Sequence, residues 1–147
     1  MTTFTLKSPL RAIESYLKAS GWFAAVHVGE QPSLAPGPGI QAVVTVTGLR
    51  TAFVTTAAQQ VWTVRVKLYR DVLADPAAQS ETDLARAVSE ISEDLLGEFD
   101  LGGSIRNVDA ANLSARWGHE TVARVMYRVA VLTVPLIVND SGGTLTP

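Results

Sequence analysis

The spacing of the apolar residues changes between two neighbouring segments, and this change limits what the chain can fold into. Two sets of side chains alternate along residues 60–70, the apolar Trp62, Val64, Val66 and Leu68 and the polar Thr63, Arg65 and Lys67. A period of two predicts a half-buried β-strand. After Ser80 the apolar residues recur at spacings of three and four, at Leu84, Val88, Ile91, Leu95 and Phe99. That spacing predicts an amphipathic helix, so strand and helix follow each other directly.

Signals for the ends of both segments lie around the change in period. Pro76 has no N–H for a β-ladder and favours extended geometry at Asp75, so the strand is expected to end before this pair. Ser80 suits the N-cap position and Asp83 the position of a capping-box acid, so we expect the helix to start at Ser80. The helix should stop at Gly97 or at Gly102-Gly103, because glycine adopts the left-handed conformation at little cost.

The first part of the chain predicts a helix, a strand and a loop. Ser8-Pro9 suits a helix start and Gly21 a helix end, and between them lie the apolar Leu10, Ile13, Tyr16 and Leu17. Residues 22–28 read as a strand with an irregular start, whose Phe23 and Ala25 lie opposite Trp22, Val26 and Val28. Residues 29–39 hold three prolines and three glycines in eleven positions, which predicts a loop that projects or contacts a partner.

The next segment has two possible arrangements. Residues 40–47 are rich in β-branched side chains and predict a strand that Gly48 breaks. Residues 49–56 then form a second strand or a β-arm, and residues 57–60 are either a loop or the beginning of the central strand.

The last part of the chain predicts a hairpin followed by a polar tail. Residues 113–118 run outward and residues 122–138 return, so that Trp117, Gly118, His119 and Glu120 fall at the turn. In the returning strand one face carries Val125, Tyr127, Val129 and Val131, and Arg128 lies on the other. Pro135 predicts an edge position or a bulge. Residues 139–147 form the polar tail.

The composition favours a single domain with a large oligomeric contact. A chain of 147 residues fits one domain, spanning residues 1–147. Apolar residues make up 47% and charged residues 18%, and mean hydropathy is +0.20, so one domain must leave apolar surface exposed. The net charge of −2, without a basic run, disfavours nucleic-acid binding. No signal-like or membrane-spanning segment is evident, and the lack of cysteine excludes disulfides.

Residues suited to catalysis or to holding a cofactor do not form a recognisable pattern. His27 and His119 are the only histidines, and we interpret both as packed or solvent-facing. Ser104 lacks the surroundings of an activated nucleophile, and Gly102-Gly103 follows the helix where a phosphate loop would precede one. The sequence therefore assigns no catalytic residue, no cofactor and no metal.

Several charged side chains have two readings. Glu90, Glu93 and Asp94 form either a solvated helix surface or a subunit contact. Arg65 and Lys67 are either solvent-facing or paired with acids of a neighbouring subunit.

Five sequence segments, taken in their order along the chain, resemble the tail terminator (tail-completion) proteins of long-tailed bacteriophages. They are SPLRAIESYL, WTVRVKLYR followed by a DP turn, ETDLARAVSEISEDL, LGGSIRNVD and MYRVAVLTVPLIVND. The resemblance implies an α+β domain in which two helices pack on a twisted, mainly antiparallel sheet with long loops or a β-arm. It also implies a six-membered ring in the virion, assembled in the host cytoplasm, at the head-proximal end of the tail.

In that family the ring ends polymerisation of the tail tube and joins the tail to the head. Its expected partners are copies of itself, the tail-tube protein and a head-completion or neck protein, with no membrane and no sequence-specific nucleic acid. The candidate contact residues are Pro32, Leu34, Pro36, Pro38, Arg50, Phe53, Arg65, Lys67, Arg106, Asn139 and Asp140. The alternatives are a head-closure or adaptor protein, a tail-tube subunit, and a small enzyme or ligand-binding domain that uses His27 or His119.

Overall fold

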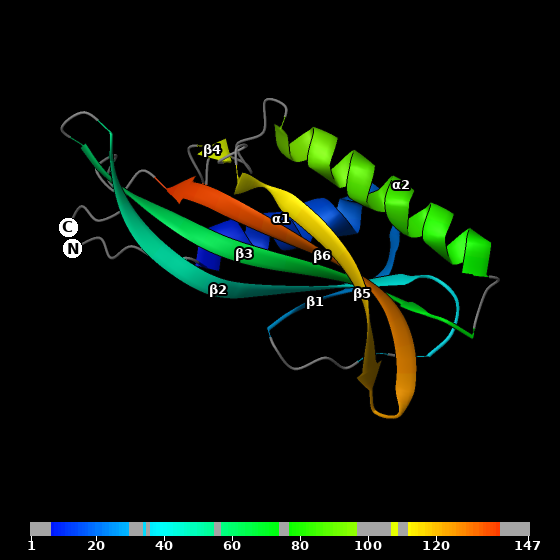
Figure 1. Ribbon diagram of the computed structural model, residues 1–147. Coiled ribbons are helices and arrows are strands. Elements are labelled where there is room, and N and C mark those ends of the chain that lie inside the picture. Colours follow the sequence, from blue (N-terminus) through cyan, green and yellow to red (C-terminus); the bar gives the residue numbers. More distant parts are fainter. Residues whose placement is uncertain are drawn as a thin grey trace.

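The chain folds into one sheet with two helices (Figure 1). The computed structural model describes residues 7–29, 34, 36–54, 57–73, 77–96, 107–108 and 112–138. Its elements are α1 (Lys7–Ser20), β1 (Phe23–Val28), β2 (Ile40–Val54), β3 (Ala57–Asp71), α2 (Ala77–Leu96), β4 (Asn107–Val108), β5 (Ser114–Val122) and β6 (Val125–Val138).

The sheet is mixed but mainly antiparallel. Its strand order is β1-β2-β3-β6-β4, and β5 also pairs with β6. Only the β1–β2 pair is parallel, whereas β2–β3, β3–β6, β4–β6 and β5–β6 are antiparallel. This arrangement confirms the expected α+β class.

Alternating residues of the central strands build the core on one face of the sheet. On β3, Val64, Val66 and Leu68 are at most 2% exposed. They pack with the apolar stripes of both helices and with the corresponding residues of β2 and β6, so α1 and α2 cover the same face. Each buried side chain of this size contributes about 1.5–3 kcal/mol to stability.

Strand β2 passes through Gly48 without a break, so the expected interruption is wrong. The β2–β3 register shifts between Val46 and Gly48, which leaves Thr47 as the extra residue of a β-bulge. A bulge bends a strand but preserves the pairing on both sides. Residues 57–60 accordingly begin β3, and the last pairing with β6 is Gln60 with Val138. Beyond it, residues 52–54 and 57–59 pair only with each other among the described residues, and we call them the arm.

Helix α1 has nearly the expected bounds, but α2 starts earlier than expected. Gly21 follows α1 with a φ of 80°, as a glycine stop requires. Helix α2 begins at Ala77, directly after Pro76 in the sequence, so Ser80 is a first-turn residue and not the N-cap. Alanine is the strongest helix former, which explains the added residues. Asp83 accepts a hydrogen bond from Gln79 at 2.9 Å and pairs with Arg70, so it does not complete a capping box with Ser80.

The apolar stripe predicted for α2 is confirmed. Leu84, Val88, Ile91 and Leu95 are buried in the core, whereas Phe99 lies outside the described residues. The helix ends at Leu96, the residue before Gly97, and Gly102-Gly103 also lies outside the described residues.

The β5–β6 hairpin is present, but its turn is at Ala123-Arg124. Both residues have positive φ, 49° and 69°, as a two-residue type I′ turn demands. This turn type usually carries Asn-Gly. The Ala-Arg pair therefore did not indicate a turn, and the turn was predicted around Gly118 instead. Gly118 and His119 therefore lie within β5, and His119 pairs with Arg128.

The expectation about Phe23 is wrong, whereas the expectation that Pro135 lies at an edge holds on one side of β6. Phe23 packs on the core together with Trp22 and Val26, because the β1–β2 register shifts between Phe23 and Ala25. Pro135 is not at a bulge, because it pairs with Thr63 of β3 in an unbroken register. On its other side, β5 pairing ends at Thr133 and β4 pairing begins at Leu136, so the described residues place no strand beside Pro135.

Candidate interaction surfaces

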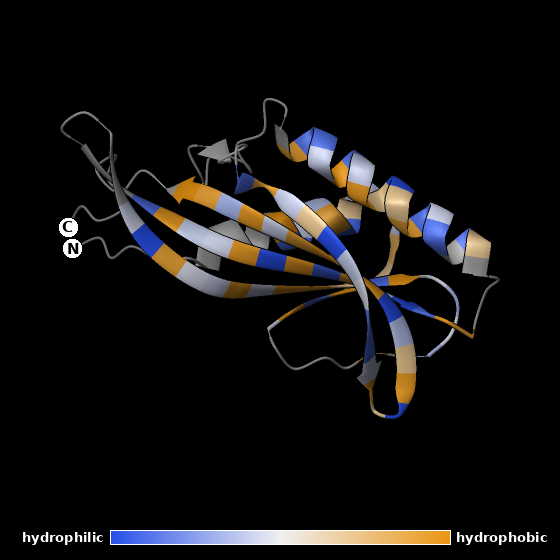
Figure 2. Cartoon of the chain, viewed as in Figure 1, coloured by the Kyte–Doolittle hydropathy of each residue, from blue (hydrophilic) through white to orange (hydrophobic). Residues whose placement is uncertain are grey.

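The two faces of the sheet differ in how they are covered. Both helices lie on one face, which we call the helix-covered face, and the other is the open face (Figure 1). Apolar and polar residues alternate along the strands, so the two faces receive different chemistry (Figure 2). Three of the predicted contact residues, Leu34, Arg65 and Lys67, belong to the open face or pack on it.

One end of the open face is itself apolar and covered. Its four buried residues are Val43, Tyr69, Tyr127 and Val129, and the partly buried Leu34, Val122, Val125 and Val131 pack against them. The rings of Tyr69 and Tyr127 meet edge to face, with centroids 5.7 Å apart. Val125, Tyr127, Val129 and Val131 therefore share one face, as the sequence predicted.

The loop after β1 is docked on this end of the sheet at the residues the structure describes. Leu34 packs against the tyrosine cluster, and the Gly37 N–H donates to Asp71 Oδ2 at 3.0 Å. Asp71 Oδ1 also accepts from the Leu73 N–H at 2.9 Å, so one carboxylate fixes two segments. Pro36 and Pro38 are exposed, which leaves them available to a partner.

A polar network joins β3 and β5 next to the tyrosine cluster. Lys67 Nζ lies 3.1 Å from Glu120 Oε2, and the Tyr69 hydroxyl donates to Glu120 Oε1 at 2.9 Å. Burial and the hydrogen bond to Glu120 raise the pKa of Tyr69 above its usual value. Lys67 thus has its acid within the same chain, a pairing that the sequence did not indicate because the two residues are far apart along it.

Next to this network the open face carries polar side chains. Arg65 pairs across the sheet with Thr45 on one side and Thr133 on the other, and all three are partly exposed. Arg116 of β5 pairs with Val131 of β6, and its side chain is exposed on the same face. Arg116 was not predicted as a contact residue, since β5 lacks a clear alternating pattern.

The arm and the residues at its base carry two of the predicted contact residues. Arg50 is exposed just before the arm, beside Leu49, whose side chain is 50% exposed. The backbone of Phe53 belongs to β2, and its side chain is not among those described. The remaining predicted contact residues, Pro32, Arg106, Asn139 and Asp140, lie outside the described residues.

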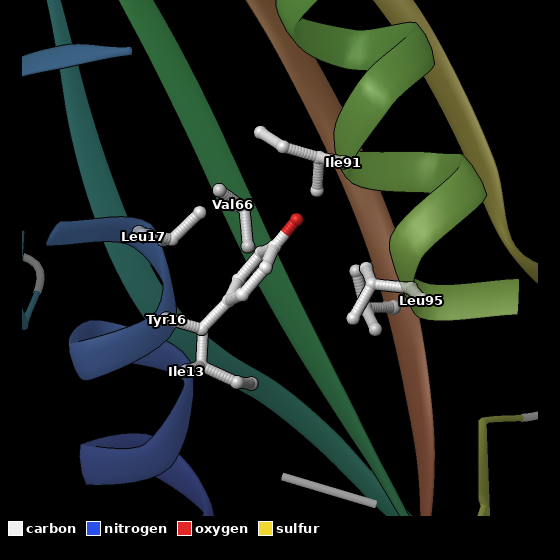
Figure 3. Close-up of a pocket in the computed structure, with 7 residues that line it drawn as sticks. Ile13, Tyr16, Leu17, Val66, Ile91 and Leu95 are labelled. Carbon is white, nitrogen blue, oxygen red and sulfur yellow. The ribbon is translucent and has the colours of Figure 1, made fainter. Parts of the chain in front are cut away.

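A small cavity lined by described residues lies between the two helices and the sheet, on the helix-covered face. It measures about 10 Å³, and Ile13, Tyr16, Leu17, Val66, Ile91, Leu95 and Val134 line it (Figure 3). A volume of this size holds about one water molecule, against roughly 300–1,000 Å³ for a typical ligand pocket. The Tyr16 hydroxyl points from α1 towards α2 and donates to Asp94. Burial and this hydrogen bond raise the pKa of Tyr16.

The two histidines are separated by the width of the sheet. His27 lies on β1, and the side chains of its pairing partner Val43 and of His27 share the open face. His119 lies on β5 and pairs with Arg128, whose side chain reaches Glu81 on the helix-covered side. With three strands between them and about 4.8 Å per strand spacing, they cannot act on one reacting atom.

Two searches of the described residues also found nothing. No group of three or more His, Cys, Asp or Glu residues in the described ranges is arranged to hold a metal ion. None of the described helices combines the length and the apolar character needed to cross a membrane.

A scan against protein-family models found no matching family, and a search of curated proteins found no match.

Proposed function

We propose that the protein is a structural component of a phage virion, which forms a ring at the head-proximal end of the tail tube. The ring ends polymerisation of the tube and presents the surface to which the head is joined. The proposal rests on the order of sequence phrases that resemble tail terminator proteins and on the surfaces of the folded domain.

The arm is the observation that carries the proposal. Its two strands extend past the last β6 pairing, at Gln60 with Val138, and pair only with each other among the described residues. A two-stranded hairpin is marginally stable by itself in water, so a neighbouring protein would be expected to support it. Leu49 at its base is 50% exposed, which suits an apolar contact with that neighbour.

The surfaces of the domain also support formation of a ring. A closed ring repeats one contact between two unlike patches, so each copy must carry both patches. Among the described residues the domain offers an edge at β1, an opposite edge formed by β4 and β5, and two dissimilar faces, and so supplies unlike surfaces within one chain. The excess of apolar residues in the sequence supports an extensive contact of this kind.

To end polymerisation of the tail tube, the ring needs only a suitable shape. A ring that complements the end of the tube on one side, but does not reproduce that end on the other, removes the next binding site for a tube subunit. The proposed function therefore needs no catalytic group. A head-closure protein or a tube subunit is the nearest alternative, and the position and number of rings in a virion separate the three.

Imaging of particles assembled without the protein tests the proposal. We expect tails of uncontrolled length that are not joined to heads, and restoration of both properties by the wild-type chain. In the virion, labelling should find a single ring at the neck end of each tail. Tails of normal length joined to heads in its absence would contradict the proposal, and many stacked rings would identify a tube subunit instead.

Two shortened chains locate the contact. One lacks residues 52–59, which include both strands of the arm, and the other lacks residues 33–38 of the loop. We expect the arm deletion to abolish termination while the sheet up to Gln60 still folds, as circular dichroism would show. If the arm deletion terminates normally and the loop deletion does not, the loop is the contact.

A further inference from the structure

Two sets of charges without an ion pair, one basic and one acidic, lie on opposite sides of the sheet. Four ion pairs among the described residues satisfy much of the remaining charge: Lys18 with Glu14, Lys67 with Glu120, Arg70 with Asp83, and Arg128 with Glu81. No ion pair or hydrogen bond within the described residues involves the side chains of Arg65 and Arg116, on the open face, or those of Glu90 and Glu93, on α2.

The two arginines lie on the same part of the open face. The register places Arg65 of β3 opposite Thr133 of β6, and Thr133 opposite Ser114 of β5. Arg116 is two residues further along β5, so the two arginines are separated by β6 and their backbones lie roughly 12 Å apart. The short side chains of Thr133 and Val131 lie between them on β6, which leaves room for both guanidinium groups to reach the same partner.

The two glutamates form a matching feature on the opposite side of the molecule. Glu90 and Glu93 are exposed and lie three residues apart on α2, which makes them neighbours on the helix surface. Ile91 and Leu95 of the same helix are buried, so the core holds this face of α2 outward and fixes its direction. The carboxylates are therefore presented by a rigid element.

We propose that the polar part of the open face, around Arg65 and Arg116, binds the Glu90–Glu93 surface of α2 in a second copy of this chain. The contact rests on the proposed ring and specifies which surfaces meet in it. It joins two unlike patches, as a head-to-tail assembly requires. Arginine can hold a carboxylate through two parallel hydrogen bonds, which fixes the orientation of one copy against the next.

A second copy fits this surface better than a nucleic acid does. Affinity for a phosphate backbone grows with the number of cations that contact it, and the open face offers two unpaired arginines on a chain with a net charge of −2. A second copy supplies two carboxylates with the spacing of one helical turn. The numbers and signs of the charges then match within a single kind of chain.

The contact is tested by reversing the charges of each surface in a separate variant and then mixing the two variants. One variant combines Arg65→Glu with Arg116→Glu, and another combines Glu90→Lys with Glu93→Lys. We expect each variant alone to associate at least about 10-fold more weakly than the wild type, because attraction becomes repulsion. In an equimolar mixture of the two variants, we expect association through this contact to be recovered. The mass of the assembly, measured by native mass spectrometry or light scattering, would show it.

Matched controls reverse exposed charges elsewhere. Arg124→Glu lies in the β5–β6 turn and Lys18→Glu lies on α1, and both side chains are exposed. Neither control should change the mass. Circular dichroism and the unfolding midpoint verify each fold, and if the arginine variant fails to fold, the α2 variant with its surface substitutions still tests the contact.

The outcomes separate this contact from the ring itself. If the wild type assembles and the four reversals do not alter its mass, the contact is overturned while the proposed ring stands. If loss of assembly in the single variants is not repaired by mixing, the pairing of these two surfaces is overturned. A wild type that stays monomeric and binds duplex DNA through Arg65 and Arg116 overturns both proposals.

Discussion

The helix-covered face and the open face of the same sheet are built from alternate residues of the same strands. On the helix-covered face, Val64, Val66 and Leu68 meet two helices and are at most 2% exposed. One residue further along the strand, Arg65 and Lys67 emerge on the open face among threonines and charges. Because side chains alternate along a strand, stability and binding can be assigned to the two faces almost independently.

The open face is itself divided. Near Tyr69 and Tyr127 it is apolar and covered by the docked loop and the curled β5–β6 hairpin, whereas around Arg65 and Arg116 the described residues leave it uncovered. The covered part acts as a second, smaller core that fixes the loop. The uncovered part makes little contribution to the fold, which leaves its residues free to serve a contact with another protein.

Leu68→Ala on the helix-covered face should have the largest effect on stability. The side chain is 0% exposed, so its removal forfeits burial and leaves a cavity, and we expect a loss of about 2–5 kcal/mol in the free energy of unfolding. Urea unfolding at a concentration where the protein is monomeric measures it. Arg65→Ala, on the open face of the same strand, is the matched control and should change stability by about 0.5 kcal/mol or less. Equal losses in the two variants would break the contrast between the faces.

Asp83→Ala tests the polar rim of the helix-covered face. Asp83 lies 3.0 Å from Arg70, whose side chain is only 8% exposed, so the substitution leaves a nearly buried cation without this carboxylate. Fully buried pairs lose about 3–5 kcal/mol when one partner is removed, and since Asp83 is 23% exposed we expect about 2 kcal/mol. Glu93→Ala on the same helix is the control. If the two variants unfold at the same urea concentration, the pair does not hold α2 on the sheet.

The sequence predicted the helix-covered face well because periodicity reports burial directly. The alternation along β3 and the stripe of Leu84, Val88, Ile91 and Leu95 each identify which side chains face inward. Turns and bulges were harder to predict from the sequence. The bulge at Thr47 and the Ala123-Arg124 turn depend on backbone pairing across strands, and neither carries the residue types that usually mark such features.

The open face was predicted only in part, since its chemistry depends on residues that are distant in the sequence. Arg65 and Lys67 were recognised as outward-facing from their alternation with valines. Their different surroundings were not, because Glu120, which pairs with Lys67, and Arg116, which lies near Arg65, belong to β5. The placement of β5 beside β6 follows from a hairpin whose turn was expected at Gly118.

Alkaline pH should act on both faces, through the three tyrosines of the chain. Burial raises the pKa of Tyr16, Tyr69 and Tyr127, and the carboxylates of Asp94, Glu120 and Asp71 respectively add to the effect. A pKa raised in the folded state means that the stability linked to the neutral hydroxyl is fully present below pH of about 10, where unfolded tyrosine ionises, and is lost as pH rises further.

Spectroscopic titration checks this prediction. We expect tyrosinate absorbance to appear only together with unfolding, above the pH at which free tyrosine ionises. Tyr69→Phe should remove one tyrosine from the titration and slightly reduce the sensitivity to alkali. Tyrosinate that forms near pH 10 while the circular dichroism stays native would show that the rings are accessible in the folded protein.

Glu81→Gln should have the smallest effect, although Glu81 lies two residues from Asp83 on α2 and also meets an arginine of the sheet. Its side chain is 52% exposed, so we expect a loss below about 1 kcal/mol at neutral pH, reduced further by salt. The hydrogen bond from Arg128 lowers the pKa of Glu81, so this stability is present above the unfolded pKa and is lost as pH falls through the folded pKa. Wild type and variant should therefore converge in acid. A loss of stability as large as that of Asp83→Ala, or one that persists in acid, would show that burial does not decide how strongly such pairs hold the helix. In wild type and variant alike, Arg128 keeps its hydrogen bond to the Gly118 carbonyl at 3.2 Å.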